Sequence, residues 1–349
     1  MRATVIHGPR DIRVENVPDP QIRRPGDALV RVVASCVCGS DLWPYRGVTK
    51  TTSPRRIGHE FVGVVEEVGS DVSSLVAGDF VIAPFALSDN TCVHCRNGVH
   101  TSCEHGAWWG GVDEYGLDID GGQGEAVRVA MADGTLVATP EMPDDSMVPS
   151  LLTLSDVMGT GHHAAVAAGV GPGTTAVVVG DGAVGLCAVL AARRLGADRV
   201  IAMSRHTDRQ AVAREFGATD IVEERGADGV ARIEDLLSGT GADAVLECVG
   251  TRESMQQAIG AARPGGRVGY VGAPNGGPEL PIRELFNRNV SVGGGVAPVR
   301  GYLEDLLADT WSGAITPGRV FDLELPLDQA ADAYEAMDER RSIKTMLRP

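Results

Sequence analysis

Hydrophobic positions in the first 138 residues form short runs rich in β-branched side chains, and turn residues separate these runs. Such runs predict strands, because β-branched residues fit a pleated, half-buried surface better than a helix. The strands expected here are residues 28–33, 61–68, 80–84 and 126–130. This part of the chain is therefore predicted to form a β-rich barrel.

The pattern changes near residue 144, where a polar segment precedes a helical pattern over residues 146–170 that ends at a Gly-Pro-Gly stop signal. Short apolar runs and helical patterns then alternate. The strands expected are 176–179, 200–203, 244–246, 267–271 and 290–292, with helices such as 183–195 and 208–216 between them. This alternation predicts an α/β fold with a doubly wound parallel sheet.

The alternation stops after about residue 298, where two helical patterns surround a short strand at 321–325. The helices are expected at 302–311 and 327–339. Because this tail and the β-rich part flank a complete nucleotide-binding unit, the tail is expected to pack onto the β-rich part. Two domains are predicted, residues 1–150 with 298–349 and residues 151–297.

Composition narrows the classes of partner. A chain of 349 residues exceeds the usual size of a single core, and its net charge of -16 comes with no Lys/Arg cluster that could follow a phosphate backbone. Nucleic acid is therefore not expected as a partner. The first residues lack a signal-peptide pattern and no segment is long and apolar enough to cross a membrane, so a cytoplasmic protein is expected.

The seven cysteines favour metal ligation over a disulfide framework. Cys92, Cys95 and Cys103 lie within twelve residues of one another, a spacing that suits thiolate ligands. Cys187 and Cys248 lie inside apolar runs, where a free cysteine is usually a small buried hydrophobe.

A glycine-rich segment at residues 177–185 reads V-V-V-G-D-G-A-V-G, directly after an expected strand and at the start of an alanine-rich helix. In this context G-x-G-x-x-G predicts dinucleotide binding. The first glycine permits a tight turn, the second lets backbone approach a pyrophosphate, and the third allows close helix packing. Free N–H groups of the helix start attract phosphate. The cofactor-binding residues expected are Gly180, Gly182, Ala183, Val184 and Gly185.

The end of the next expected strand bears on which nicotinamide cofactor binds. An acidic residue there would accept a hydrogen bond from the ribose 2′-hydroxyl of NAD. The chain instead has Ser204, Arg205 and His206 at this place, with Arg209 one turn further. A serine hydroxyl and a guanidinium suit a 2′-phosphate. The sequence therefore favours NADP over NAD. The alternative is that these are solvated helix-cap residues beside a site that takes either cofactor.

Two turn segments offer zinc ligands. Cys38 begins a C-G-S-D segment and His59 lies in G-H-E-F-V-G, and zinc binds thiolate and imidazole well. Asp156 is the candidate third ligand. Three protein ligands with one open position would make a catalytic, Lewis-acid site rather than a structural one.

Together these segments resemble the medium-chain, zinc-dependent alcohol dehydrogenases over nearly the whole chain. The resemblance implies a GroES-like β-rich catalytic domain and a Rossmann dinucleotide-binding domain. It implies that Cys38, His59 and Asp156 hold a catalytic zinc, that Ser40 relays a proton, and that Glu60 can swing toward the metal. Asp156 is a departure, since it falls where many relatives have Cys or Glu.

The cysteine cluster resembles the family's structural zinc lobe, whose pattern is C-x2-C-x2-C-x7-C. Its first cysteine is missing, and Asp89 falls in that position. A second zinc with Asp89 as fourth ligand is expected, since zinc accepts oxygen less favourably than thiolate but does accept it. The alternatives are free thiols in an empty lobe, or completion of the shell by His94 or His100.

The reaction expected is hydride transfer between NADP and a small alcohol, ketone or aldehyde. A NAD-dependent polyol or amino-alcohol dehydrogenase is the main alternative. A zinc-free quinone or enoyl reductase would not need the three catalytic ligands, and a nucleotide-binding structural or regulatory protein without turnover would need neither metal nor relay. By resemblance, an edge strand near residues 290–295 suggests a homodimer or homotetramer. Aromatic residues could line the substrate pocket or pack within loops: Trp43, Phe85, Trp108, Trp109 and Tyr115.

Overall fold

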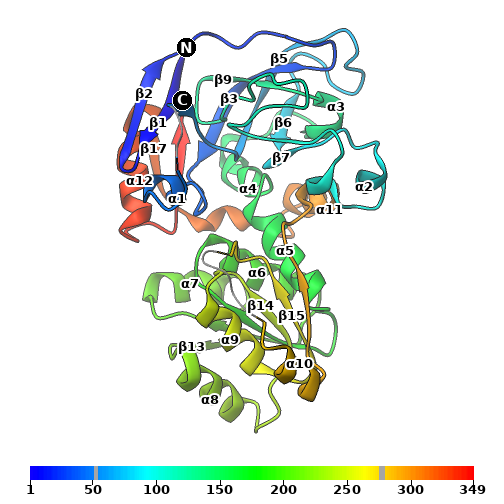
Figure 1. The fold of residues 1–349 in the computed structure, drawn as a ribbon, viewed down its shortest axis with the longest axis vertical. Helices are drawn as coiled ribbons and strands as arrows, with labels where there is room; N and C mark the ends of the chain where they lie inside the picture. The colour runs from blue at the N-terminus through cyan, green and yellow to red at the C-terminus, as the bar shows by residue number, and fades with distance from the viewer. Residues whose placement is uncertain (51–53, 275–279) are drawn as a thin grey trace. The chain divides into compact units, whose positions relative to one another are not determined.

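The protein is described by a computed structural model covering residues 1–50, 54–274 and 280–349. The chain divides into two compact units (Figure 1). Unit 1 comprises Met1–Asp156 and Pro298–Pro349, and unit 2 comprises Val157–Ala297. Asp156 is thus the last residue of the first segment of unit 1.

Unit 1 is built on a seven-stranded sheet whose strands come from both ends of the chain. Its order is β10 (Val137–Ala138), β6 (Phe80–Ala83), β5 (Phe61–Val68), β3 (Ala28–Cys36), β18 (Lys344–Arg348) and β17 (Phe321–Pro326), and β9 (Ala126–Val129) also pairs with β3. Apolar side chains such as Val30, Val65 and Val127 fill the core beneath it. The β-rich first part is therefore confirmed.

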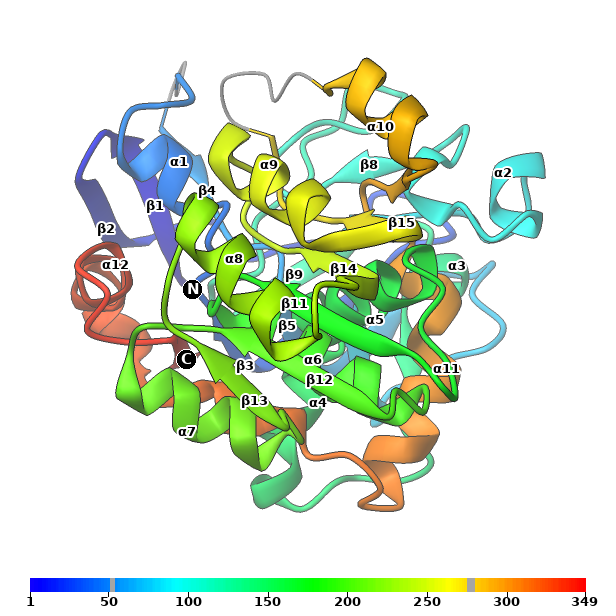
Figure 2. The same cartoon turned by 90° about the horizontal axis from the view of Figure 1, so that it is seen from below.

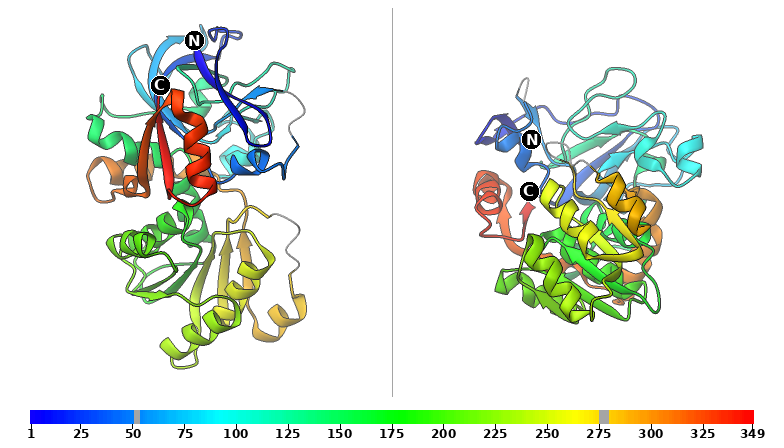
Figure 3. Two further views of the ribbon diagram at one scale, coloured as in Figure 1. Left: turned by 90° about the vertical axis from the view of Figure 1, so that its left-hand side faces the viewer. Right: turned by 60° about the horizontal axis from the view of Figure 1, so that its bottom comes forward.

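Segments distant in sequence meet in unit 1 (Figure 3). The N-terminal strands β1 (Arg2–Gly8) and β2 (Asp11–Asn16) form a small sheet with β4 (Arg55–Arg56), and the C-terminal helix α12 (Ala330–Asp338) packs against β2. Strand β18 pairs with β3, with Met346 opposite Cys36. The C-terminal tail therefore completes the same unit as the N-terminal strands. Short elements of the unit are β7 (Ala86–Leu87), β8 (Ala107–Trp108), α1 (Leu42–Tyr45), α2 (Val93–Arg96) and α3 (Ala132–Thr135). The longer helix α11 (Val299–Trp311) also belongs to it.

The single helix expected over residues 146–170 is wrong. The segment forms α4 (Val148–Thr153) and α5 (Val157–Ala167), with a turn between them. The Ser155 hydroxyl donates to the carbonyl of Leu152, and the Ser155 carbonyl accepts from the backbone N–H of Phe85. Serine and threonine hydroxyls compete with helical hydrogen bonds in this way. The break places Asp156 in a turn.

Unit 2 contains a six-stranded, wholly parallel sheet, as the alternating pattern predicts. Its order is β13 (Asp220–Val222), β12 (Arg199–Met203), β11 (Thr175–Val179), β14 (Ala242–Glu247), β15 (Ala262–Tyr270) and β16 (Ser291–Gly294). The order reverses between β11 and β14. In such sheets ligands bind outside the carboxyl ends of the strands at this reversal.

Helices cover both faces of this sheet (Figure 2). α5 and α6 (Ala183–Arg194) contact each other and α7 (Thr207–Glu215) follows α6, while α8 (Gly226–Leu236) and α9 (Arg252–Ala261) pack together on the other face with α10 (Ile282–Arg288). The doubly wound α/β fold is therefore confirmed. Within the described ranges, no helix combines the length and the hydropathy needed to cross a membrane.

Candidate active site

Four potential metal ligands converge in unit 1. Cys38 follows β3, His59 and Glu60 precede β5, and Asp156 occupies the turn between α4 and α5. One ligand atom from each of these four residues lies within 4.8 Å of the others. The three catalytic ligands expected from the sequence are thus brought together from segments far apart in the chain, and Glu60 joins them.

The distances suit a small tetrahedral ion. Cys38 Sγ lies 3.6 Å from Asp156 Oδ2, and His59 Nε2 lies 3.5 Å from the same oxygen. Thiolate, imidazole and carboxylate atoms at zinc bond lengths and tetrahedral angles are about 3.3–3.8 Å apart. The donor set and its spacing therefore fit Zn²⁺.

A residue that the sequence reasoning did not assign orients this group. Asp41 Oδ1 lies 3.2 Å from His59 Nδ1, and Asp41 Oδ2 accepts the backbone N–H of Cys38 at 3.0 Å. A carboxylate on Nδ1 fixes the ring and leaves Nε2 directed at the metal position. Burial alone would lower the pKa of His59, but the charges of Asp41 and Cys38 and hydrogen bonds to Asp156 and Asp41 raise this pKa well above its usual value.

A buried ion pair with Lys344 fixes the position of the Glu60 side chain. Lys344 Nζ lies 2.7 Å from Glu60 Oε1, and both side chains are almost completely buried. The Cys36 thiol donates to Glu60 Oε2 at 3.3 Å, and Lys344 also donates to the carbonyl of Val37 at 3.3 Å. Burial raises the pKa of Glu60, and the Lys344 charge opposes this rise. No local sequence signal links Lys344 to this site.

Ser40 lies at the exposed edge of the same group. Its Oγ is 3.5 Å from His59 Nε2, and both residues line a pocket of about 220 Å³ together with Arg55 and Trp109. The Phe85 ring meets the His59 ring edge-on at 6.4 Å between centroids. Of the aromatic residues considered from the sequence, Trp109 thus lines the pocket and Phe85 contacts a candidate ligand.

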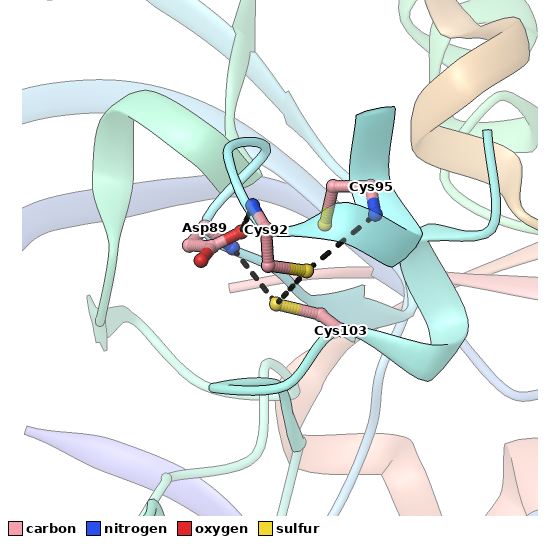
Figure 4. A group of neighbouring side chains, drawn as sticks. All are labelled: Asp89, Cys92, Cys95 and Cys103. Atoms are coloured by element: carbon pink, nitrogen blue, oxygen red, sulfur yellow. Dashed lines mark hydrogen bonds between the residues drawn. The ribbon is translucent and has the colours of Figure 1, made fainter. Parts of the chain in front are cut away.

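The second cluster gathers Asp89, Cys92, Cys95 and Cys103 (Figure 4), with their ligand atoms within 4.8 Å of one another. The sulfurs of Cys92 and Cys103 are 3.9 Å apart, close to the separation of about 3.8 Å expected for two thiolates on one zinc. Neither His94 nor His100 belongs to this group of the described residues. The side chain of His100 instead contacts Asn90 Oδ1 at 2.8 Å.

Hydrogen bonds from the backbone favour the ionised form of Asp89 in this cluster. Its Oδ1 accepts the backbone N–H groups of Thr91 at 2.8 Å and Cys92 at 3.0 Å. Burial tends to raise the pKa of Asp89, but these hydrogen bonds lower it well below its usual range. Burial raises the pKa of the Cys95 thiol. A bound cation would stabilise its thiolate and so allow it to ionise.

The glycine-rich turn of unit 2 joins β11 to α6. Gly180 has a φ of 120°, and a Cβ on Gly185 would lie 2.0 Å from the carbonyl oxygen of Gly180. The backbone of the turn itself therefore requires glycine at these two positions. A Cβ on Gly182 would meet nothing within 4 Å, so a need for glycine there would come from a ligand outside the protein. Ala183 and Val184 form the first turn of α6, which has no side-chain cap.

Of the four residues expected around the ribose end, Ser204, Arg205 and His206 lie between β12 and α7, and Arg209 lies in the first turns of α7. They differ in environment. Ser204 is buried, Arg205 and His206 are exposed, and Arg209 is half-buried. Ser204 Oγ donates to Asp181 Oδ2 at 2.9 Å, and Arg209 Nη1 donates to the carbonyl of Asp181 at 3.0 Å. The sequence reasoning assigned no role to Asp181.

Comparisons with known families place the chain. Residues 24–141 match the alcohol dehydrogenase GroES-like domain, and residues 183–309 match the zinc-binding dehydrogenase domain. Together the two models cover well over half of the chain. The protein belongs to the medium-chain, zinc-dependent alcohol dehydrogenase superfamily.

Individual relatives agree with this placement. The chain is 33% identical over 358 residues to zinc-type alcohol dehydrogenase B of Aspergillus flavus, covering 100% of this chain and 81% of the relative. Alcohol dehydrogenase TADH from Thermus sp. ATN1 has a TM-score of 0.91 at 33% identity, covering 100% and 99% of the two chains. A protein described as a zinc-binding dehydrogenase from Sinorhizobium meliloti 1021, bound to NADP, has a TM-score of 0.83 at 27% identity, covering 100% and 99%. The chain is thus a zinc-type alcohol dehydrogenase oxidoreductase.

Proposed function

We propose that this oxidoreductase transfers hydride between NADP(H) and a small alcohol, ketone or aldehyde at a zinc centre. The observation that carries the proposal is the grouping of Cys38, His59 and Asp156 around one point, with Asp41 orienting the imidazole. A nucleotide-binding protein without turnover would have no use for that grouping. A screen of alcohols, aldehydes and ketones with both cofactors, on protein of known zinc content, tests it.

In this proposal Cys38, His59 and Asp156 hold the ion and leave one position open, as in catalytic rather than structural zinc sites. Bound zinc would polarise the alcohol or carbonyl oxygen, and a bound pyridine nucleotide would accept or supply the hydride.

Asp41 keeps His59 in the tautomer that presents Nε2 to the ion. Ser40, exposed at the pocket and able both to donate and to accept, moves the hydroxyl proton. Glu60, paired with Lys344, is a reserve ligand beside the group.

A second, structural zinc is proposed at Asp89, Cys92, Cys95 and Cys103. Asp89→Ala should lower the zinc content from two ions per chain to one and reduce the melting temperature by about 5 °C or more, because the loop loses the bond that closes it. Asp89→Cys should keep both ions, since it restores a fourth thiolate. Mass spectrometry of metals and thermal unfolding give the two readouts. Two tightly bound zinc ions in Asp89→Ala would remove Asp89 from the ligand set.

NADP is proposed as the preferred cofactor. Ser204 and Arg205 directly follow β12, where NAD enzymes commonly place an acidic residue, and α7 begins two residues further on. The NADP-bound relative from Sinorhizobium meliloti supports a fold of this type that accepts the 2′-phosphate. The oligomeric state is proposed to be a homodimer or homotetramer, and this rests on the family resemblance alone.

Arg205→Ala tests this preference. It should lower kcat/KM for NADP by about tenfold to a hundredfold, the value of one charge-assisted hydrogen bond, and change kcat/KM for NAD little. Arg214→Ala, which removes an exposed arginine in the last turn of α7, is the matched control and should alter neither value. An unchanged NADP preference in Arg205→Ala would take this residue out of the role.

A further inference from the structure

A carboxylate lies in the part of unit 2 that is proposed to bind the ribose 2′-phosphate. Asp181 is the second residue of the glycine-rich turn, between Gly180 and Gly182. Its Oδ2 accepts the Ser204 hydroxyl at 2.9 Å, and its Oδ1 lies 3.7 Å from Arg209 Nη1. The side chain of Asp181 remains 12% exposed, so a ligand can still reach it. Asp181 thus engages two of the groups expected to hold a phosphate.

The Ser204 hydroxyl cannot serve both anions at once. A hydroxyl has one proton to donate, and an ionised carboxylate only accepts. While that proton is shared with Asp181, Ser204 has none for a phosphate oxygen. Ser204 is also fixed from other sides, since its carbonyl accepts from Gln210 Nε2 at 3.0 Å and its Oγ accepts the His206 backbone N–H at 3.3 Å. The hydroxyl proton has two acceptors within reach, and the Asp181 carboxylate at 2.9 Å is nearer than the His206 carbonyl oxygen at 3.4 Å.

The two cofactors meet this carboxylate in opposite ways. A 2′-phosphate carries about -1.5 to -2 charge near neutral pH and is repelled by a neighbouring carboxylate. A ribose 2′-hydroxyl instead donates to a carboxylate, the contact that NAD-binding sites use. Arg205 and Arg209 favour the phosphate, and Asp181 opposes them.

We propose that Asp181 is a specificity-determining residue of the cofactor site: the glycine-rich turn supplies the carboxylate that the end of β12 lacks, and it limits the advantage of NADP over NAD. The inference rests on the proposed nicotinamide-dependent function. It assigns the balance between the cofactors to one carboxylate opposed by two arginines, all carried by the same unit.

The experiment measures Kd for NADPH and NADH by fluorescence titration, with kcat and KM for both cofactors beside it. Asp181→Asn keeps the size of the side chain and an acceptor for Ser204 but removes the charge. It should raise the NADPH over NADH affinity ratio by about tenfold to a hundredfold, with the change in KM rather than in kcat. Asp181→Ser is a second variant that removes the charge and should shift the ratio in the same direction.

Asp235→Asn is the control for charge alone, because Asp235 is an exposed carboxylate in the last turn of α8, whose C-terminal end lies away from the carboxyl ends of the strands. It should leave the affinity ratio unchanged. An unchanged ratio in both Asp181 variants would overturn the inference, and a shift of the ratio in Arg205→Ala would at the same time uphold the proposed NADP site. If Asp181→Asn shifts the ratio and Arg205→Ala does not, the inference stands and the role of Arg205 fails. Absence of binding by either nucleotide would overturn both.

Discussion

Cys38→Ala is expected to lose the catalytic zinc and about a thousandfold to ten-thousandfold in kcat/KM. A Lewis acid stabilises developing charge by several kcal/mol, and each 1.36 kcal/mol is a factor of ten in rate. Cys38 Sγ faces the Asp156 carboxylate at 3.6 Å and supplies the one thiolate of the set, so an alanine leaves the ion with two protein ligands and Glu60. Zinc content and steady-state turnover on the same sample measure the effect.

Cys187→Ala is the matched control, since Cys187 is a buried cysteine of α6 outside both ligand groups. It should keep both zinc ions and turnover close to that of the parent protein. Full turnover by a Cys38→Ala protein without zinc at this site would contradict the proposed chemistry.

Lys344→Met is expected to destabilise the fold by about 3–5 kcal/mol, because it leaves the carboxylate of Glu60 buried without its cation. The pair is 2.7 Å apart with side-chain exposures of 1% and 0%, so solvent cannot replace the lost partner. Urea unfolding of zinc-loaded protein, followed by circular dichroism, measures the change.

The chain offers a close control for this variant. It has two lysines, and Lys50 is exposed, so Lys50→Met should change the free energy of unfolding by less than about 0.5 kcal/mol. The double variant Lys344→Met with Glu60→Gln should recover a large part of the lost stability, since both charges are then gone. Parent-like stability of Lys344→Met alone would contradict this expectation, because it would mean that the buried Glu60 does not need the Lys344 charge.

Much of the architecture follows from periodicity. The β-branched runs before residue 138 and the later alternation of strand and helix are local patterns, and both sheets form where these patterns lie. The break between α4 and α5 was missed because it depends on where the Ser155 hydroxyl and carbonyl find partners. A hydrophobic pattern does not record such choices, although it is this break that places Asp156 beside Cys38.

The candidate site likewise contains some residues that sequence patterns could indicate and others that they could not. Cys38, His59 and Asp156 could be singled out as candidate zinc ligands because zinc restricts the residue types that bind it and because the surrounding motifs are short. The structure groups their ligand atoms. Asp41 and Asp181 stand inside those motifs, but their roles depend on contacts with His59 and Ser204 that no spacing rule predicts. Lys344 reaches Glu60 across 284 positions of sequence, and the pairing of β18 with β3 brings the two residues together.

The measurement that bears most directly on a zinc-dependent centre is anomalous diffraction from crystals of active, zinc-loaded protein, recorded on both sides of the zinc absorption edge. The proposed chemistry predicts a zinc peak bound by Cys38 Sγ, His59 Nε2 and a carboxylate oxygen of Asp156, separate from a second peak at the cluster of Asp89 and the three cysteines. An active crystal with no anomalous density among Cys38, His59 and Asp156 would contradict it.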